Sequence, residues 1–225
     1  MVWTALVKRN VWSTMAVSPV FSASSGTIQN VEITDTSALV FGALTVAGNL
    51  TGTISNGAVT QSGALVVPGT TTVTASGQNI TFNDANNNFG TIGVTGADVT
   101  IRDTNAVILA ASTVSGDFSV TAAGAITDSG NISVDGSGKT ATFAAGSSNN
   151  ITLNNSNDFK TLLITSGNDV TIVDTDEINI GASTVSGDLS VTADGAITDS
   201  GNIAVDGSSK TATFAAGSSN NITLN

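Results

Sequence analysis

Aspartates recur at a fixed spacing along the chain and are the side chains best suited to acid–base chemistry. Asp128 and Asp199 both lie in the motif TDSG and are 71 residues apart. The same spacing separates the members of three further pairs: Asp98/Asp169, Asp103/Asp174 and Asp117/Asp188. Two carboxylates can hydrolyse a glycosidic bond as acid and as nucleophile or base, so a β-helix depolymerase is one hypothesis. A catalytic pair is singular, however, whereas these aspartates recur in each copy of a repeated unit. We expect them to form Asx-turns with their own backbone and expect no catalytic residue.

A second acidic group could be read as a cation site. Asp174, Asp176 and Glu177 supply carboxylate oxygens, which Ca²⁺ prefers. The equivalent upstream positions are Asp103, Asn105 and Ala106. The calcium-binding nonapeptide pattern GGxGxDxUx is absent from the sequence. We therefore expect an acidic surface here, with no metal and no cofactor.

Threonine patches and Gly-containing segments suggest two further kinds of site. The Thr-x-Thr patches at 70–74, 140–142 and 211–213 suggest an ice-binding surface. A flat ice-matching face needs the motif on every coil, however, and here the motif occurs about once per repeated unit. Thr is also simply a good strand residue. The segments GSGK (136–139) and GSSK (207–210) lack the GxxxxGK[ST] spacing of a phosphate-binding loop.

The composition excludes other classes of chemistry. The 225 residues include no His, Cys or Tyr, and 6 Lys+Arg against 17 Asp+Glu give a net charge of −11. The chain thus lacks the residues for a Ser-His-Asp triad, a thiolate nucleophile or a disulfide. So few cations argue against nucleic-acid partners, and the longest aliphatic run, Ala106–Ala111, is too short for membrane insertion. The mixture of Ala, Val and Ile with Thr, Ser, Asn and Gly favours a soluble, almost all-β chain.

The chain repeats itself with a period of about 71 residues. Residues 112–154 and 183–225 are identical at 39 of 43 positions. The four differences are Phe118/Leu189, Ala123/Asp194, Ser133/Ala204 and Gly138/Ser209. A more diverged copy, 76–112, aligns with 147–183. Self-similarity of this kind indicates a repeat architecture.

Within a unit, short stretches alternate apolar residues with Thr, Ser and Asn, which predicts strands with one buried face. Strand-and-turn modules recur every 8 to 10 residues and are interchangeable, so we expect a parallel β-solenoid (β-helix) in preference to a sandwich or barrel. We expect three coils of roughly 24 residues per 71-residue repeat. The predicted segments are an N-terminal cap or anchor (1–25), initial coils (26–56) and solenoid repeats (57–225, divided at about 57–111, 112–182 and 183–225).

The first 25 residues differ in composition from the rest. They contain both tryptophans and a basic pair: Trp3, Lys8, Arg9 and Trp12. One interpretation is a cap over the end of the solenoid. A second is an assembly anchor, because Trp and Arg dominate interface hot spots. A third is a secretion signal, although its apolar region is interrupted by polar residues and Pro19.

Two stretches, GDLSVTADGAITDSGNIAVDG and TFAAGSSNNITLNNSNDF, resemble the β-helical repeats of filamentous-haemagglutinin-like exoproteins of two-partner secretion. Similar repeats occur in other large bacterial surface proteins. The resemblance covers about residues 40–225 and implies a right-handed β-helix acting as a stalk or adhesive fibre. Residues 1–40 do not resemble the N-terminal secretion domain of these exoproteins. A phage or virion fibre, often a homotrimer, fits an aromatic N-terminal segment equally well.

These observations favour a non-enzymatic structural fibre on a virion or bacterial cell surface. We expect residues 1–25 to dock it on a surface or particle protein, and self-association as a homotrimer is a further expectation. The first alternative is a secreted adhesin whose acidic, Thr-lined faces bind a host glycan or receptor, and the depolymerase is the least favoured. The last copy breaks off within its unit at Asn225, so we also expect further coils in the natural protein.

Overall fold

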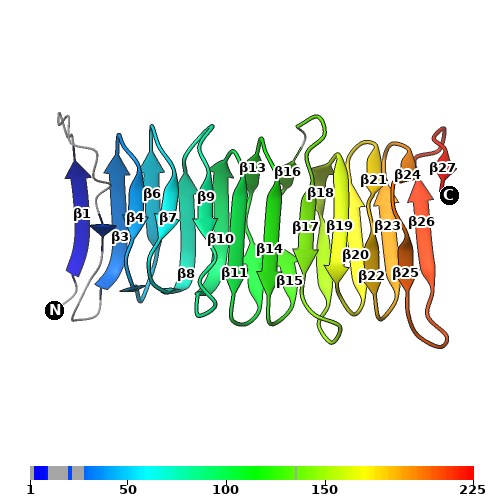
Figure 1. Ribbon diagram of the computed structural model, residues 1–225, viewed down its shortest axis with the longest axis horizontal. Helices are drawn as coiled ribbons and strands as arrows, with labels where there is room; N and C mark the ends of the chain where they lie inside the picture. The colour runs from blue at the N-terminus through cyan, green and yellow to red at the C-terminus, as the bar shows by residue number, and fades with distance from the viewer. Residues whose placement is uncertain (1–2, 10–19, 22–27, 135) are drawn as a thin grey trace.

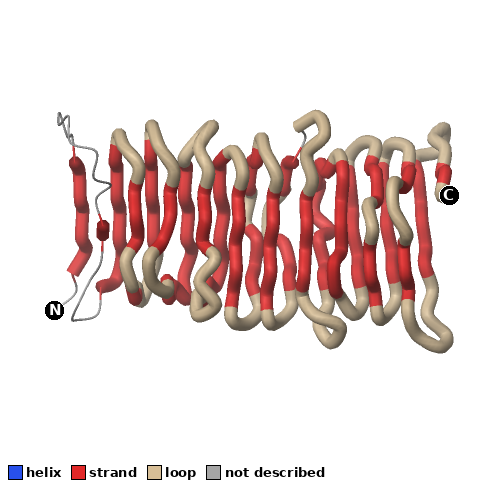
Figure 2. Tube along the Cα trace, in the orientation of Figure 1, coloured by secondary structure: helices blue, strands red, loops and turns tan. Residues whose placement is uncertain are grey.

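The computed structural model describes residues 3–9, 20–21, 28–134 and 136–225 (Figure 1). Strands and tight turns make up this part of the chain, and it contains no helix (Figure 2). The strands stack into a rod whose described ends lie at opposite ends of its long axis. The predicted all-β fold is confirmed.

Two large sheets of parallel strands form the rod. Sheet A contains β1 (Trp3–Arg9), β3 (Ile28–Asp35), β5 (Leu44–Thr45), β6 (Leu50–Ile54), β8 (Leu65–Thr74), β10 (Asn88–Gly96), β12 (Val107–Leu109), β13 (Ser112–Val114), β15 (Ile126–Asp128), β16 (Ile132–Val134), β18 (Ile151–Phe159), β20 (Val170–Asp174), β23 (Leu189–Ala193) and β26 (Ala212–Ala216).

Sheet B contains β2 (Val20–Phe21), β4 (Leu39–Phe41), β7 (Val59–Gln61), β9 (Ile80–Phe82), β11 (Val99–Asp103), β14 (Phe118–Ala122), β17 (Ala141–Ala144), β19 (Thr161–Ser166), β21 (Ile178–Ile180), β24 (Ile197–Asp199) and β27 (Ile222–Thr223). A small sheet C pairs β22 (Ser183–Val185) with β25 (Ile203–Val205). The chain alternates between the sheets, which confirms the predicted parallel β-solenoid. Each coil adds one strand to sheet B, which has eleven strands among the described residues, so at about 4.8 Å per coil the rod is ~50 Å long.

Each coil is shorter than predicted, and a repeat holds an additional half-coil. In sheet B, Ile80 stacks on Val99, Val99 on Phe118, and Phe118 on Ala141, so three coils lead from position 80 to position 141. The chain then crosses to Ile151 in sheet A, which is the counterpart of Ile80 in the next copy. The prediction of three 24-residue coils per repeat is wrong, because strands of three to five residues and tight corners close a coil in about 20. One repeat is therefore about three and a half coils, and equivalent residues lie in opposite sheets.

One continuous apolar core fills the space between the sheets. In β14, Phe118, Val120 and Ala122 are buried while the residues between them face outward. Two sets of buried phenylalanines stack along the rod with ring centroids 5.8 to 6.0 Å apart: Phe41–Phe82–Phe89 and Phe118–Phe143–Phe159. Mostly edge-on packing of this kind adds about 0.5–1.5 kcal/mol per pair to the gain from burial.

The strands of the N-terminal segment continue the sheets. β1 pairs in parallel with β3, with Trp3 opposite Ile28, Lys8 opposite Thr34 and Arg9 opposite Asp35. β2 pairs in the same way with β4 in sheet B. The described strands of residues 1–25 are thus the first strands of both sheets.

Candidate functional site

A ladder of side-chain hydrogen bonds runs along the corner that precedes β11 and β14. Asn79 Oδ1 accepts a hydrogen bond from the backbone N–H of Asp98 at 3.2 Å, and Asp98 Oδ1 accepts one from that of Asp117 at 3.0 Å. Asp117 Oδ1 in turn accepts one from the N–H of Thr140 at 3.0 Å. The predicted Asx-turn is wrong for Asp98 and Asp117, because each carboxylate bonds to the next coil and not to its own turn.

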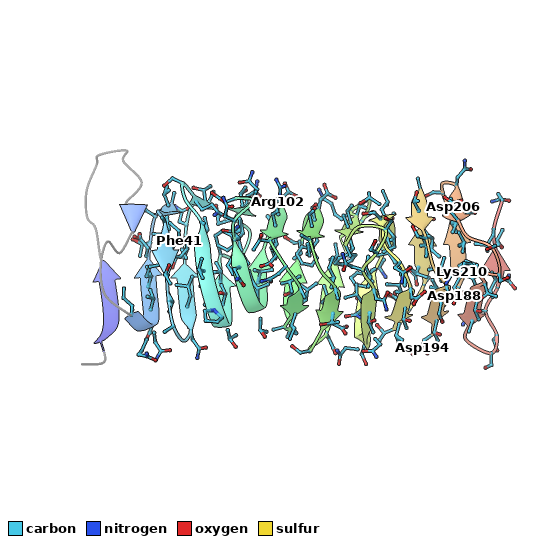
Figure 3. The ribbon with its side chains drawn as sticks, turned by 90° about the horizontal axis from the view of Figure 1, so that it is seen from below. Phe41, Arg102, Asp188, Asp194, Asp206 and Lys210 are labelled. Atoms are coloured by element: carbon cyan, nitrogen blue, oxygen red, sulfur yellow. The ribbon has the colours of Figure 1, made fainter. Side chains whose placement is uncertain are left out.

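The same ladder recurs beside sheet A, through Asn150, Asp169, Asp188 and Thr211, at 3.2, 3.0 and 2.8 Å. The backbone N–H and the hydroxyl of Thr211 both donate to Asp188, and with the nearby Lys210 they lower its pKa. Lys210 Nζ lies 3.9 Å from Asp169 and 4.0 Å from Asp188, and Figure 3 labels Lys210 beside Asp188. These repeated carboxylates join successive coils.

A second set of aspartates is buried and holds the coils together from inside. Asp103 Oδ2 accepts a hydrogen bond from the backbone N–H of Phe89 at 2.6 Å, and its Oδ1 accepts one from Asn105 N–H at 2.8 Å. Asp174 does the same, from Phe159 at 2.7 Å and Asp176 at 3.1 Å. The predicted Asx-turn is confirmed for both. Burial raises the pKa of Asp103, and that of Asp174 to about 7, because the charged form loses its hydration.

Asp128, the candidate catalytic aspartate of the TDSG motif, has both oxygens in use. They accept hydrogen bonds from the backbone N–H groups of Asn154 and Asn155, both at 3.1 Å, and from the side-chain amide of Asn157 at 2.9 Å. Asn157 is fully buried and accepts a bond from the N–H of Ile132. These bonds hold the middle of β18, between the part that pairs with β15 and the part that pairs with β16. Its counterpart Asp199 likewise accepts a bond from a backbone N–H of the next coil, that of Asn225.

Two of the three candidate calcium ligands, Asp176 and Glu177, contact a lysine. Lys160 Nζ donates to Asp176 Oδ2 at 2.5 Å and to Glu177 Oε1 at 3.4 Å, and it lies 3.7 Å from Asp158 Oδ1. These carboxylates raise the pKa of Lys160. Within the part of the chain that the structure describes, no group of three or more acidic side chains could hold a metal ion.

Threonines line up on the outer face of sheet A. The strand register stacks one hydroxyl residue per coil: Thr34, Thr53, Thr74, Thr95, Thr113 and Ser133. A search for Thr-x-Thr patches misses this column, because each coil contributes a single residue to it. Comparison of the sequence with itself at the spacing of one coil would have found it.

The C-terminal end of the rod exposes apolar side chains that the sequence did not single out. Ile222 is 45% and Leu224 40% exposed, and the side chains of Ile203, Val205 and Phe214 are partly exposed. We call these five residues the C-terminal apolar face. All of them except Ile222 line a shallow hollow of about 410 Å³. A search for reactive residue types overlooks such a surface, because it consists only of apolar side chains.

Of the four predicted anchor residues, Trp3, Lys8 and Arg9 lie on β1, and Trp12 lies outside the described residues. The strand places Lys8 and Arg9 together at its carboxyl end. It does not bring them near the repeated aspartates of the later coils, since β1 is the first strand of sheet A.

No helix that is long and apolar enough to cross a membrane occurs among the residues described. Neither the curated proteins nor the solved structures gave a match to the chain. One family model matches it three times, at residues 28–95, 96–166 and 167–225, and its description is "Repeats of unknown function (DUF5649)". These matches cover most of the rod and repeat at the spacing of the copies in the sequence. The chain therefore belongs to the family of DUF5649 repeats.

Proposed function

We propose that the chain is a non-enzymatic structural rod, a fibre or stalk that projects from a virion or cell surface. Residues 1–25 dock it, and the repeats set its length. The observation that carries this proposal is the use of the repeated carboxylates. Asp98, Asp117, Asp169 and Asp188 each accept a backbone N–H from the next coil, so their role is to stack coils.

A spacer tolerates duplication, whereas a single active site is not improved by it. Residues 112–154 and 183–225 remain 39 of 43 identical, although equivalent strands such as β14 and β23 lie in different sheets. In a solenoid each coil contacts only its neighbours, so every copy meets nearly the same surroundings. This pattern favours selection for the rod and not for one site on it.

The resemblance to filamentous-haemagglutinin-like repeats supports a bacterial surface as the setting, and a virion fibre is the alternative setting. A homotrimer would form between complete rods, because the two sheets of one chain already enclose a filled core. Side-by-side contact of rods is then the mode of assembly to look for.

Duplication of residues 112–182 tests the spacer role directly. One additional unit of about three and a half coils should lengthen the rod by ~17 Å in small-angle X-ray scattering, with attachment to the particles or cells that carry the protein unchanged. The variant Lys8→Glu/Arg9→Glu is the matched comparison and should lose attachment at unchanged length. The proposal would be contradicted if the lengthened rod no longer attached while the Lys8→Glu/Arg9→Glu variant still did.

An adhesin is the second candidate, favoured by the column of outward hydroxyls on sheet A and by the exposed acidic ladder. Hydroxyl and carboxylate groups at a fixed spacing suit hydrogen bonding to a glycan. A glycan array with the intact chain tests it, and an array blank across salt and pH would count against it. A depolymerase is the third, and it requires that Asp128→Asn abolish cleavage of a polysaccharide.

A further inference from the structure

The corner between β6 and β7 contains the only Asn-Gly pair in the sequence, Asn56–Gly57 (Figure 1). Asn56 is exposed, and no hydrogen bond joins its side-chain amide to another of the described residues. An asparagine that precedes glycine cyclises most readily, because glycine has no side chain to keep its backbone nitrogen away from the amide carbon. The corner therefore combines a free amide with an unhindered nucleophile.

This corner is one residue longer than its counterpart in the next copy. Four residues, 55–58, join β6 to β7, whereas three residues, 123–125, join β14 to β15. The N–H groups of Ser55 and Ala123 donate to equivalent carbonyls of the preceding coil, so Asn56 is the additional residue. The other copies thus contain no residue equivalent to Asn56.

Gly57 cannot be replaced by a residue that would hinder the reaction. Its φ of 104° lies in the region that favours glycine. A Cβ at this position would lie 2.5 Å from the backbone nitrogen of Ala38 in the preceding coil. The stacking of the coils therefore keeps a glycine directly after Asn56.

The next coil restrains the nucleophile. The backbone N–H of Gly57 donates to Oε1 of Gln78 at 3.1 Å. In the last copy, the N–H of the equivalent Gly195 donates to a backbone carbonyl, that of Asp176, at 2.8 Å. Cyclisation requires the Gly57 nitrogen to lose its proton and turn toward Cγ of Asn56, and the bond to Gln78 opposes both.

We propose that Asn56 is a self-modifying site of the rod and that Gln78 controls its rate. The deprotonated Gly57 nitrogen attacks Asn56 Cγ, the new C–N bond closes a succinimide ring, and the side-chain nitrogen takes up a proton and leaves as ammonia. Water then opens the ring at either carbonyl and leaves an aspartate or an isoaspartate at position 56. Both products add a negative charge. Isoaspartate also lengthens the main chain in a corner that already lies against Ala38.

Incubation of the full chain at mildly alkaline pH tests the site, with ion-exchange chromatography to detect the added charge and peptide mass mapping to locate it. Asn56 should convert. Asn131 is the internal control, because it is also exposed but precedes the branched Ile132, and it should stay intact. Asn56→Gln should abolish the added charge, since glutamine would have to close a larger ring.

Two variants of Gln78 test the control of the rate. Gln78→Met removes the acceptor at similar side-chain length and should speed conversion about 2- to 10-fold, the factor that corresponds to one ordinary hydrogen bond. Gln78→Glu keeps an acceptor oxygen and should convert no faster than the unmodified chain. Circular dichroism checks that each variant is folded.

The chain unfolded in urea supplies the rate without the fold. Conversion in urea but none in the folded chain would overturn the proposed site, as would equal conversion of Asn56 and Asn131. Equal rates in Gln78→Met and the unmodified chain would overturn the role of Gln78. The same follows if Gln78→Glu converts as fast as Gln78→Met, because the corner would then have been loosened without regard to the acceptor.

Discussion

Phe143 and Phe214 occupy the same place in successive copies, and only one of them is enclosed. Residues 139–154 and 210–225 have the same sequence, so local propensity is equal at the two sites. Phe143 is fully buried, with its ring centroid 5.9 Å from that of Phe118 and 5.8 Å from that of Phe159. Replacement of an enclosed Phe by Ala costs about 3–5 kcal/mol, and two aromatic contacts place Phe143→Ala near the upper end. Phe214→Ala removes a side chain that is still partly in water, and we expect a loss of about 1 kcal/mol.

Hydrogen exchange read by mass spectrometry is the suitable assay, because a repeat array can open locally before it unfolds as a whole. Amides of β14, β17 and β19 should lose about 4 kcal/mol of opening free energy in Phe143→Ala. In Phe214→Ala only the amides of β25 and β26 should change. Equal losses at the two sites, or a loss below about 1 kcal/mol at Phe143, would refute the account of the core.

Four further changes test three polar side chains and one turn. The pKa of Asp174 is raised in the folded state from 3.8 to about 7, so between these pH values the folded chain keeps a proton that the unfolded chain releases. The stability that Asp174 contributes is therefore lost as pH rises from about 4 to 7, by up to ~1.4 kcal/mol per pH unit. Asp174→Asn should remove this slope from urea unfolding curves, and Lys160→Met should move it to higher pH by leaving the neighbouring carboxylates unneutralised. Thr71→Val should raise the free energy of unfolding by ~1 kcal/mol in the same assay, because the buried Thr71 hydroxyl has no hydrogen-bond partner. Ser209→Gly should raise it by a similar ~1 kcal/mol, since Ser209 has φ 64° where the preceding copy has Gly138 at φ 70°; an unchanged midpoint would mean that the turn is not strained.

The fold class could be predicted from the sequence because alternation and repetition are both visible in it. Each stretch such as FSVTA has one apolar face, and near-identical copies require near-identical surroundings. The number of coils per repeat could not be predicted in the same way. A strand-and-turn module does not encode how many modules close one coil, since this depends on how closely a corner can approach the neighbouring coil. At Gly124, for example, a Cβ would lie 2.5 Å from the backbone nitrogen of Ala106.

The candidate site was predicted less completely, for a related reason. Asx-turns were expected at every repeated aspartate and are found at Asp103 and Asp174, where the N–H two residues on lies within reach. At Asp98 and Asp117 the nearer donor belongs to the next coil, and only the register of the sheets reveals it. The C-terminal apolar face could not be predicted from the sequence, because its residues differ from the buried residues of the preceding copy only by their position in the rod.

The half-coil in each repeat has a consequence for any role of the rod's sides. A whole number of coils per repeat would place all copies of a surface feature on one side, where they could engage a flat partner together. With about three and a half coils, the ladder of Asp98 and Asp117 lies beside sheet B and that of Asp169 and Asp188 beside sheet A. Successive copies thus face away from each other, so a ligand that binds one ladder cannot reach the next on the same surface. This geometry weakens multivalent binding along one side of the rod.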